Sequence, residues 1–249
     1  MKGYFFRASG TDPGINLATE EYLLRLNEEL GSAILYLWQN KDTVVIGRNQ
    51  NAYNECNVEY VRRNDIKIVR RLTGGGAVYH DLGNLNYSMI LPLALHDITR
   101  STGVVINAFK SLGIEAKATG RNDICINDRK ISGNAYYSND LVGLHHGTVL
   151  YRADSERMEA VLNVSEKKLA GHGIESVRSR VCDIVSIKPD ISLEDICMAL
   201  MGSFKEVYGI EAFNDLDIPF EEISVLAERY GKREWNLDKV TGVEGSDAI

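Results

Sequence analysis

The sequence predicts a mixed α+β fold, in which a largely antiparallel mixed sheet is flanked by helices. Three strand-like runs lie between residues 122 and 151 and are separated by Asn-Asp pairs, which is typical of an antiparallel meander. Helical patterns precede and follow these runs. Strands and helices do not alternate one by one, so a doubly wound parallel sheet is not expected.

The first half of the chain is expected to begin with a long helix. Asn16 is in position to cap it, its apolar residues recur every four positions, and Gly31 ends it after Leu30. A short helix is predicted over 57–63. Apolar runs bounded by turn residues predict strands over 34–38, 43–46, 67–71, 77–79 and 84–91.

The second half combines the meander with further helices. A helical pattern of apolar residues ends at Gly113, and the strands of the meander are expected over 122–126, 130–137 and 145–151. One later helix is expected to start at Ser155. Another starts at Ser192, with Asp195 in the capping-box position, and the last covers 220–230.

Composition describes an ordinary globular enzyme of 249 residues, with 44% hydrophobic and 25% charged residues. A formal net charge of −7 argues against a nucleic-acid partner. The four cysteines are far apart and form no CxxC pair, so neither a zinc site nor a disulfide framework is expected. The sequence has neither a signal-peptide pattern nor an apolar run as long as a membrane span. We therefore expect a cytoplasmic protein with no membrane partner.

Three consecutive glycines, Gly74 to Gly76, follow the pair Arg70-Arg71 and precede a short apolar run that ends in His80-Asp81. Glycine backbone that can approach a ligand closely, beside two guanidinium groups, is typical of a site for a phosphate or carboxylate. The alternative is a tight turn between two strands of a hairpin. The arginines and the polar residues that follow favour the binding site. The run matches neither a P-loop nor a dinucleotide fingerprint.

A second group of polar residues lies on the meander. Asp123 and Lys130 fall on neighbouring strands, where the lysine could neutralise charge on a carboxylate and a phosphate and Asp123 could orient it or reach a magnesium ion. A surface ion pair of little energetic value is the equal alternative. Strand alternation turns one of His145 and His146 inward, either to line a pocket or to sit hydrogen-bonded in the core.

Together these segments resemble the catalytic domain of lipoate-protein ligases over nearly the whole chain, from Gly14 to Asn236. The matching blocks, in order, are 43–51, 70–86, 120–135, 145–150 and 168–181. The resemblance implies a fold like that of biotin ligases and class II aminoacyl-tRNA synthetases. It also implies a reaction in which lipoate and ATP, with Mg²⁺, form lipoyl-AMP. The lipoyl group then passes to a lysine of a carrier, such as the glycine-cleavage H protein or a 2-oxoacid dehydrogenase acyltransferase subunit.

The resemblance also assigns roles to single residues. Lys130 matches the essential lysine of the family, which contacts both the carboxylate and the phosphate. The positions implied for ATP and the acyl-adenylate are Arg71, Gly74, Gly75, Gly76, Ala77, Val78, Tyr79, Asn122, Asp123 and Lys130. Those implied for lipoate are Thr73, His80, Lys130, Gly133 and His146.

Residues 1–239 are expected to form this catalytic domain and residues 240–249 a short polar tail, without the C-terminal accessory domain that many members carry. Either the chain is the large half of a split ligase with a separate small subunit, or it works alone. The first alternative function is an octanoyl or lipoyl transferase that forms a thioester on Cys125, although this residue, between Ile124 and Ile126, also fits a packed core thiol. The second is a non-catalytic lipoyl-binding protein.

Overall fold

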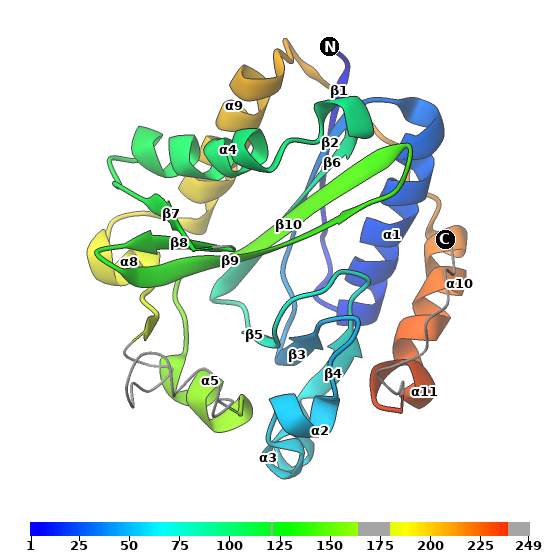
Figure 1. The fold of residues 1–249 in the computed structure, drawn as a ribbon, viewed down its shortest axis with the longest axis vertical. Coiled ribbons are helices and arrows are strands. Elements are labelled where there is room, and N and C mark those ends of the chain that lie inside the picture. The colour runs from blue at the N-terminus through cyan, green and yellow to red at the C-terminus, as the bar shows by residue number, and fades with distance from the viewer. Residues whose placement is uncertain (121, 164–179, 239–249) are drawn as a thin grey trace.

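The computed structural model describes residues 1–120, 122–163 and 180–238 and is built on a large mixed sheet (Figure 1). The predicted mixed α+β class is confirmed. Eight strands follow the order β11-β1-β2-β6-β10-β9-β8-β7. Their bounds are β1 (Gly3–Arg7), β2 (Ala33–Trp38), β6 (Asn84–Pro92), β7 (Lys117–Thr119), β8 (Asp123–Ile126), β9 (Arg129–Ser138), β10 (Val142–Leu150) and β11 (Phe213–Asn214).

The predicted meander forms one half of this sheet. Strands β6, β10, β9, β8 and β7 pair antiparallel, whereas β1 pairs parallel with both β2 and β11. Asn127 and Asp128 link β8 to β9, and both have positive φ angles, 49° and 61°, as the two central residues of a type I′ hairpin turn do. This turn sets Asp123 opposite Gly133, with a bulge between Ile124 and Cys125.

A second sheet has three strands in the order β4-β3-β5, namely β4 (Lys67–Arg70), β3 (Thr43–Ile46) and β5 (Val78–His80). Strand β3 lies in the middle, parallel to β4 and antiparallel to β5. The glycine run connects β4 to β5, which are not neighbours. It is therefore a connection across β3, and the hairpin-turn alternative was wrong.

Helices cover both faces of the large sheet (Figure 1). Helices α1 (Pro13–Leu30) and α10 (Phe220–Gly231) pack on one face, and α4 (Ile98–Ser111) and α9 (Leu193–Tyr208) on the other. Strand β2 shows the division, because alternate residues belong to the two cores: Ala33, Leu35 and Leu37 to one, and Ile34, Tyr36 and Trp38 to the other. Burial on both faces explains why this strand reads as a continuous apolar run.

A third core lies around the small sheet, where α3 (Val58–Arg63) and α5 (Ser155–Val161) pack against each other. The other short helices are α2 (Ala52–Glu55), η1 (Leu93–Leu95), α8 (Ile184–Ile187) and α11 (Arg233–Asn236). Among the helices of the described residues, none is long and apolar enough to cross a membrane.

The start of the first helix differs from the prediction. Asp12, rather than Asn16, caps α1, and its carboxylate accepts from the backbone N–H groups of Gly14 and Ile15. Asn16 is buried one turn further on and donates to the backbone oxygen of Gln39 and to Asn40. The predicted ends elsewhere are confirmed: Gly31 is left-handed with φ 58°, and Ser192 and Asp195 form a capping box.

Candidate active site

Two cavities lie against the large sheet beneath the glycine run and share one boundary. The smaller, of about 270 Å³, is lined by residues of β6, β9 and β10, by Leu17 of α1, and by the connection between β4 and β5. The larger, of about 470 Å³, extends towards α5 and the start of the chain beyond residue 179. The residues common to both are Ala77, Val78, Asp123, Lys130 and Thr148.

The pair Lys130 and Asp123 stands at this boundary. The lysine Nζ lies 2.7 Å from the Asp123 Oδ1, and the two side chains are 33% and 44% exposed. Gly133 leaves the space that the lysine occupies, since a Cβ at this position would lie 2.8 Å from Nζ. The pair is thus a half-buried charge couple facing two cavities, which gives it access to ligands on both sides.

Arg71 organises the glycine run from within. Its guanidinium is buried and donates to the Thr73 hydroxyl (3.0 Å) and to the backbone oxygens of Gly74 and Gly76 (2.6 and 2.8 Å). Gly75 has a φ of 91°, and a Cβ there would lie 2.8 Å from the guanidinium, so the loop needs glycine for both its backbone conformation and its close approach. Burial lowers the pKa of Arg71 to about 10, which still leaves it charged at neutral pH.

Arg70 does not belong to this site, contrary to the prediction that both arginines flank an anion. Its side chain is fully buried and lines neither cavity in the described part of the chain. Each of its guanidinium nitrogens donates to backbone oxygens, on residues Gly47, Arg48, Gln50, Trp235 and Asn236. Arg70 therefore joins α11 to the loop after β3.

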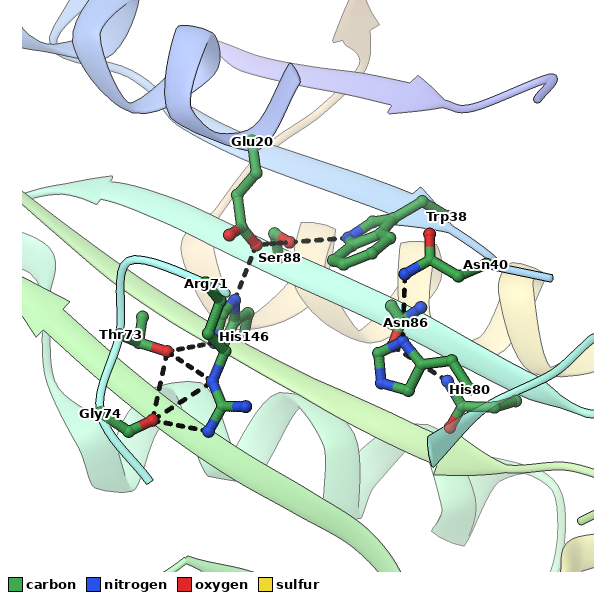
Figure 2. A network of polar contacts seen from close by, with 11 residues as sticks. Glu20, Trp38, Asn40, Arg71, Thr73, Gly74, His80, Asn86, Ser88 and His146 are labelled. Atoms are coloured by element: carbon green, nitrogen blue, oxygen red, sulfur yellow. Dashed lines mark hydrogen bonds and ion pairs between the residues drawn. The ribbon is translucent and has the colours of Figure 1, made fainter. Parts of the chain in front are cut away.

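A buried chain of hydrogen bonds borders the smaller cavity at Arg71 and His146 (Figure 2). His146 lies 2.8 Å from Glu20 through Nδ1 and 2.8 Å from the Thr73 hydroxyl through Nε2. Arg71 can only donate to Thr73, so the Thr73 proton is available for Nε2, and Nδ1–H donates to the carboxylate. Ser88 donates to the same Glu20 oxygen. The network therefore fixes the orientation of the His146 ring.

His80 also lines the smaller cavity and lies apart from this chain, beside Asn40 and Asn86 (Figure 2). Burial, reinforced by Arg71 and His146, lowers the pKa of His80 to about 3. Its Nδ1 accepts from the Asn40 amide at 3.2 Å, which places the remaining ring proton on Nε2. That nitrogen and the Asn86 Nδ2 are buried and have no hydrogen-bond partner among the described residues.

Most of the predicted site residues come together around the two cavities. The smaller cavity is lined by Arg71, Gly75, Gly76, Ala77, Val78, His80, Asn122, Asp123, Lys130, Gly133 and His146, and the larger by Tyr79 as well as the shared residues. Thr73 and Gly74 lie one layer behind, bound to Arg71 and, for Thr73, to His146. Cys125 lies on the wall of the larger cavity, where its sulfur is 3.0 Å from the Thr119 hydroxyl.

Several lining residues were not predicted. Trp38, Asn86 and Thr148 face the smaller cavity from three neighbouring strands, and the strand pairing that aligns them is not local in sequence. In the sequence, Glu20 is only an acidic residue in an early turn of the first helix, whereas the structure buries its side chain. Most of the predicted block 168–181 lies outside the described residues. The two members of the block that the structure describes, Arg180 and Val181, line the larger cavity.

Comparison with known proteins places the chain in a family. Residues 12–205 match the family described as the lipoyl protein ligase A/B catalytic domain, and the chain belongs to this family. It is similar, at 30% identity and a TM-score of 0.85 over the full length of both chains, to a structure from a bi-partite lipoate protein ligase system of Thermoplasma acidophilum.

Two ligand complexes are similar to the chain to nearly the same extent. One is P. falciparum LipL1 in complex with lipoate, with 27% identity and a TM-score of 0.82 over 98% of this chain and 76% of that one. The other is a lipoate-protein ligase A bound with ATP, with 28% identity and a TM-score of 0.82 over 95% of this chain and 98% of that one.

Proposed function

We propose that the chain is an ATP-dependent lipoate-protein ligase, which forms lipoyl-AMP and transfers the lipoyl group to a lysine of a carrier protein. The observation that carries this proposal is the position of Lys130. One cation stands where a narrow cavity meets a wider one, so it can contact a carboxylate from one side and a phosphate from the other. Family membership, with similarity to lipoate-bound and ATP-bound ligases, supports both ligands.

Lipoate is assigned to the smaller cavity. Its carboxylate would lie at Lys130, and its chain would pass over Gly133 and Thr148 towards His146. His146 precedes Thr148 by two residues in β10, so the two residues lie about 7 Å apart. Leu17, Trp38 and Val45 supply apolar contacts for the chain. Gly133 has no side chain, so the floor of the smaller cavity stays free beside the Lys130 ammonium.

ATP is assigned to the larger cavity, with its α-phosphate at the shared boundary. A lipoate carboxylate oxygen attacks the α-phosphorus, the bond from phosphorus to the bridging oxygen breaks, and pyrophosphate leaves. Two negative groups must approach each other, so the charge of Lys130 lowers the barrier by neutralising them, and Asp123 holds the ammonium in place. Arg71 keeps the adjoining glycine run in position.

Magnesium would enter with ATP and neutralise charge on the pyrophosphate that leaves. Asp123 is the residue placed to hold it, because its carboxylate borders both cavities. Among the described residues no three His, Cys, Asp or Glu side chains form a cluster that could bind a metal alone.

The second step needs no nucleophile from the chain. The carrier's lysine nitrogen attacks the lipoyl carbonyl carbon, the bond to the AMP oxygen breaks, and the amine proton passes to water. The carriers expected are the glycine-cleavage H protein and 2-oxoacid dehydrogenase acyltransferase subunits. Similarity to the bi-partite system with its E2 lipoyl domain supports a carrier of this class and a separate small subunit for adenylation.

All four cysteines are free thiols, in keeping with the cytoplasm.

The test mixes the purified chain with lipoate, ATP, magnesium and an apo carrier domain, and records the intact mass of the carrier. Lys130→Ala should abolish the lipoyl mass shift, while Lys117→Ala, which replaces an exposed lysine on β7, two strands away in the same sheet, should leave it unchanged. If the wild type is inactive, pre-formed lipoyl-AMP is supplied. Transfer from it would mean that adenylation needs a separate subunit, and failure with both substrates would refute the proposal.

A further inference from the structure

A second polar network lies beneath the floor of the site, on the side of the large sheet that faces α4. Tyr87 and His145 are fully buried there, and both direct hydrogen bonds to the side-chain oxygen of Asn134. The distance from His145 Nε2 to that oxygen is 2.8 Å, and Ser101 of α4 lies 2.7 Å from the other ring nitrogen. The Asn134 amide is thus held from one side by a phenol and an imidazole.

The other end of the Asn134 amide contacts Asn122, next to the pair of Asp123 and Lys130. The Asn134 Nδ2 and its backbone N–H both donate to the backbone oxygen of Asn122, at 3.0 and 2.8 Å, and the Asn122 side-chain amide donates back to the backbone oxygen of Asn134 at 2.9 Å. Three hydrogen bonds therefore fix Asn122, the residue directly before Asp123. Since Asp123 pairs with Lys130, the position of Asn122 determines where the lysine ammonium is held.

The fold leaves room for this arrangement at one glycine. A Cβ on Gly147 would lie 2.4 Å from the Tyr87 hydroxyl and 2.6 Å from the Asn134 side-chain oxygen, distances that no packed structure accepts. The network is buried and its central amide is satisfied on both sides, which makes it stiff, because any displacement leaves a buried donor or acceptor unpaired. Tyr87 and His145 are not among the cavity-lining residues of the described chain, so neither can contact a ligand there.

We infer that Asn134 is a positioning residue for adenylation: it sets Asp123, and through it Lys130, and Tyr87 and His145 hold its amide from behind the sheet. Its effect on rate rests on the proposed function. A displacement of about 1 Å at reacting groups can lower a rate by about 100-fold. The expected signature is a loss in kcat for lipoyl-AMP formation with an unchanged KM for lipoate, because most of the smaller cavity is left intact.

The test uses variants of graded severity. Asn134→Ala should lower kcat by about 100-fold, and Tyr87→Phe, which removes one donor and keeps the ring, by about 3- to 10-fold. Ser203→Ala is the matched control, since it removes a buried hydrogen bond of 2.7 Å to α4 that is not linked to Asn134. Thermal unfolding gives the folded fraction of each variant. Equal losses of kcat in Ser203→Ala and Tyr87→Phe, or a parallel rise in KM for lipoate, would overturn the inference.

Two further measurements separate this inference from the proposed function. A double-mutant cycle should show that Tyr87→Phe has little effect on kcat once Asp123 is replaced by Asn, and full additivity would contradict a path through Asp123. The ¹H–¹⁵N signal of the Asp123 amide should move in Tyr87→Phe and stay in Ser203→Ala. This readout needs no activity, so it would still support or overturn the positioning role if the chain made no adenylate.

Discussion

The fully buried Arg70 provides a sharp test of how the C-terminal part of the chain supports the site. Its guanidinium makes five hydrogen bonds to backbone oxygens, three on the loop 47–50 and two on α11. Arg70→Met keeps the apolar stem of the side chain and removes all five. Taking the typical net value of about 1 kcal/mol for each bond, the expected loss is about 5 kcal/mol of the free energy of unfolding. That exceeds the effect of most single substitutions.

The assay is urea unfolding at neutral pH, with the m value compared between variants to check that the same surface is exposed. Arg63→Met is the control, because Arg63 is 75% exposed and pairs with Glu59 on the surface, where a change within about 0.5 kcal/mol is expected. Lipoyl-AMP formation should fall too, because Gly47 of the loop packs directly beneath the Gly75 oxygen. A loss of stability under about 1 kcal/mol for Arg70→Met would refute the reasoning.

Three further predictions concern the site. Gly133→Ala should lower adenylation at least tenfold while leaving the unfolding midpoint almost unchanged, because the new methyl displaces the flexible end of Lys130; normal activity would show that the lysine acts from elsewhere. His80 is neutral when folded, with a pKa of about 3 against 6.5 when exposed, so the unfolded chain takes up the proton first as pH falls. Its contribution to stability is complete above pH 6.5 and is lost towards pH 3, by at most about 1.4 kcal/mol per pH unit, and His80→Gln should flatten this dependence in urea titrations between pH 4.5 and 7. Cys125→Ala should retain ATP-dependent carrier lipoylation, and its inactivity would favour a thioester mechanism.

Short-range sequence patterns predicted the antiparallel meander, whereas the arrangement of the small sheet depends on pairing between strands that are distant in sequence. The Asn127-Asp128 turn and the alternating inward and outward residues on both sides of it lie within about fifteen residues. The sequence alone was therefore enough to predict the hairpin of β8 and β9. The hairpin-turn alternative for the connection between β4 and β5 was wrong, because β3, which ends 21 residues before β4 begins, lies between them. A glycine run between two strands looks the same in sequence whether the strands pair or not.

The same limit applies to the site residues. Arg70 and Arg71 are adjacent, and consecutive residues at the end of a strand face opposite ways, so one of them had to leave the cavity. The sequence does not say which one, because that depends on where α11 and the large sheet lie. Glu20 was missed for a related reason: its partners, Ser88 and His146, come from strands β6 and β10. Lys130 and Asp123 could be paired in advance because one short hairpin carries both.

The boundary between the two cavities is assembled from two sheets, and this explains why buried charged residues lie beside it. Lys130 and Asp123 belong to the large sheet, whereas Arg71 and the glycine run belong to the small one. The bond between Thr73 and His146 links these two parts, and Glu20 of α1 anchors the histidine. Apolar packing alone would let the sheets slide by fractions of an ångström, since dispersion contacts are weakly directional. Hydrogen bonds that end on Arg71 and Glu20 restrict that freedom, so the two cavities keep a fixed geometry around Lys130.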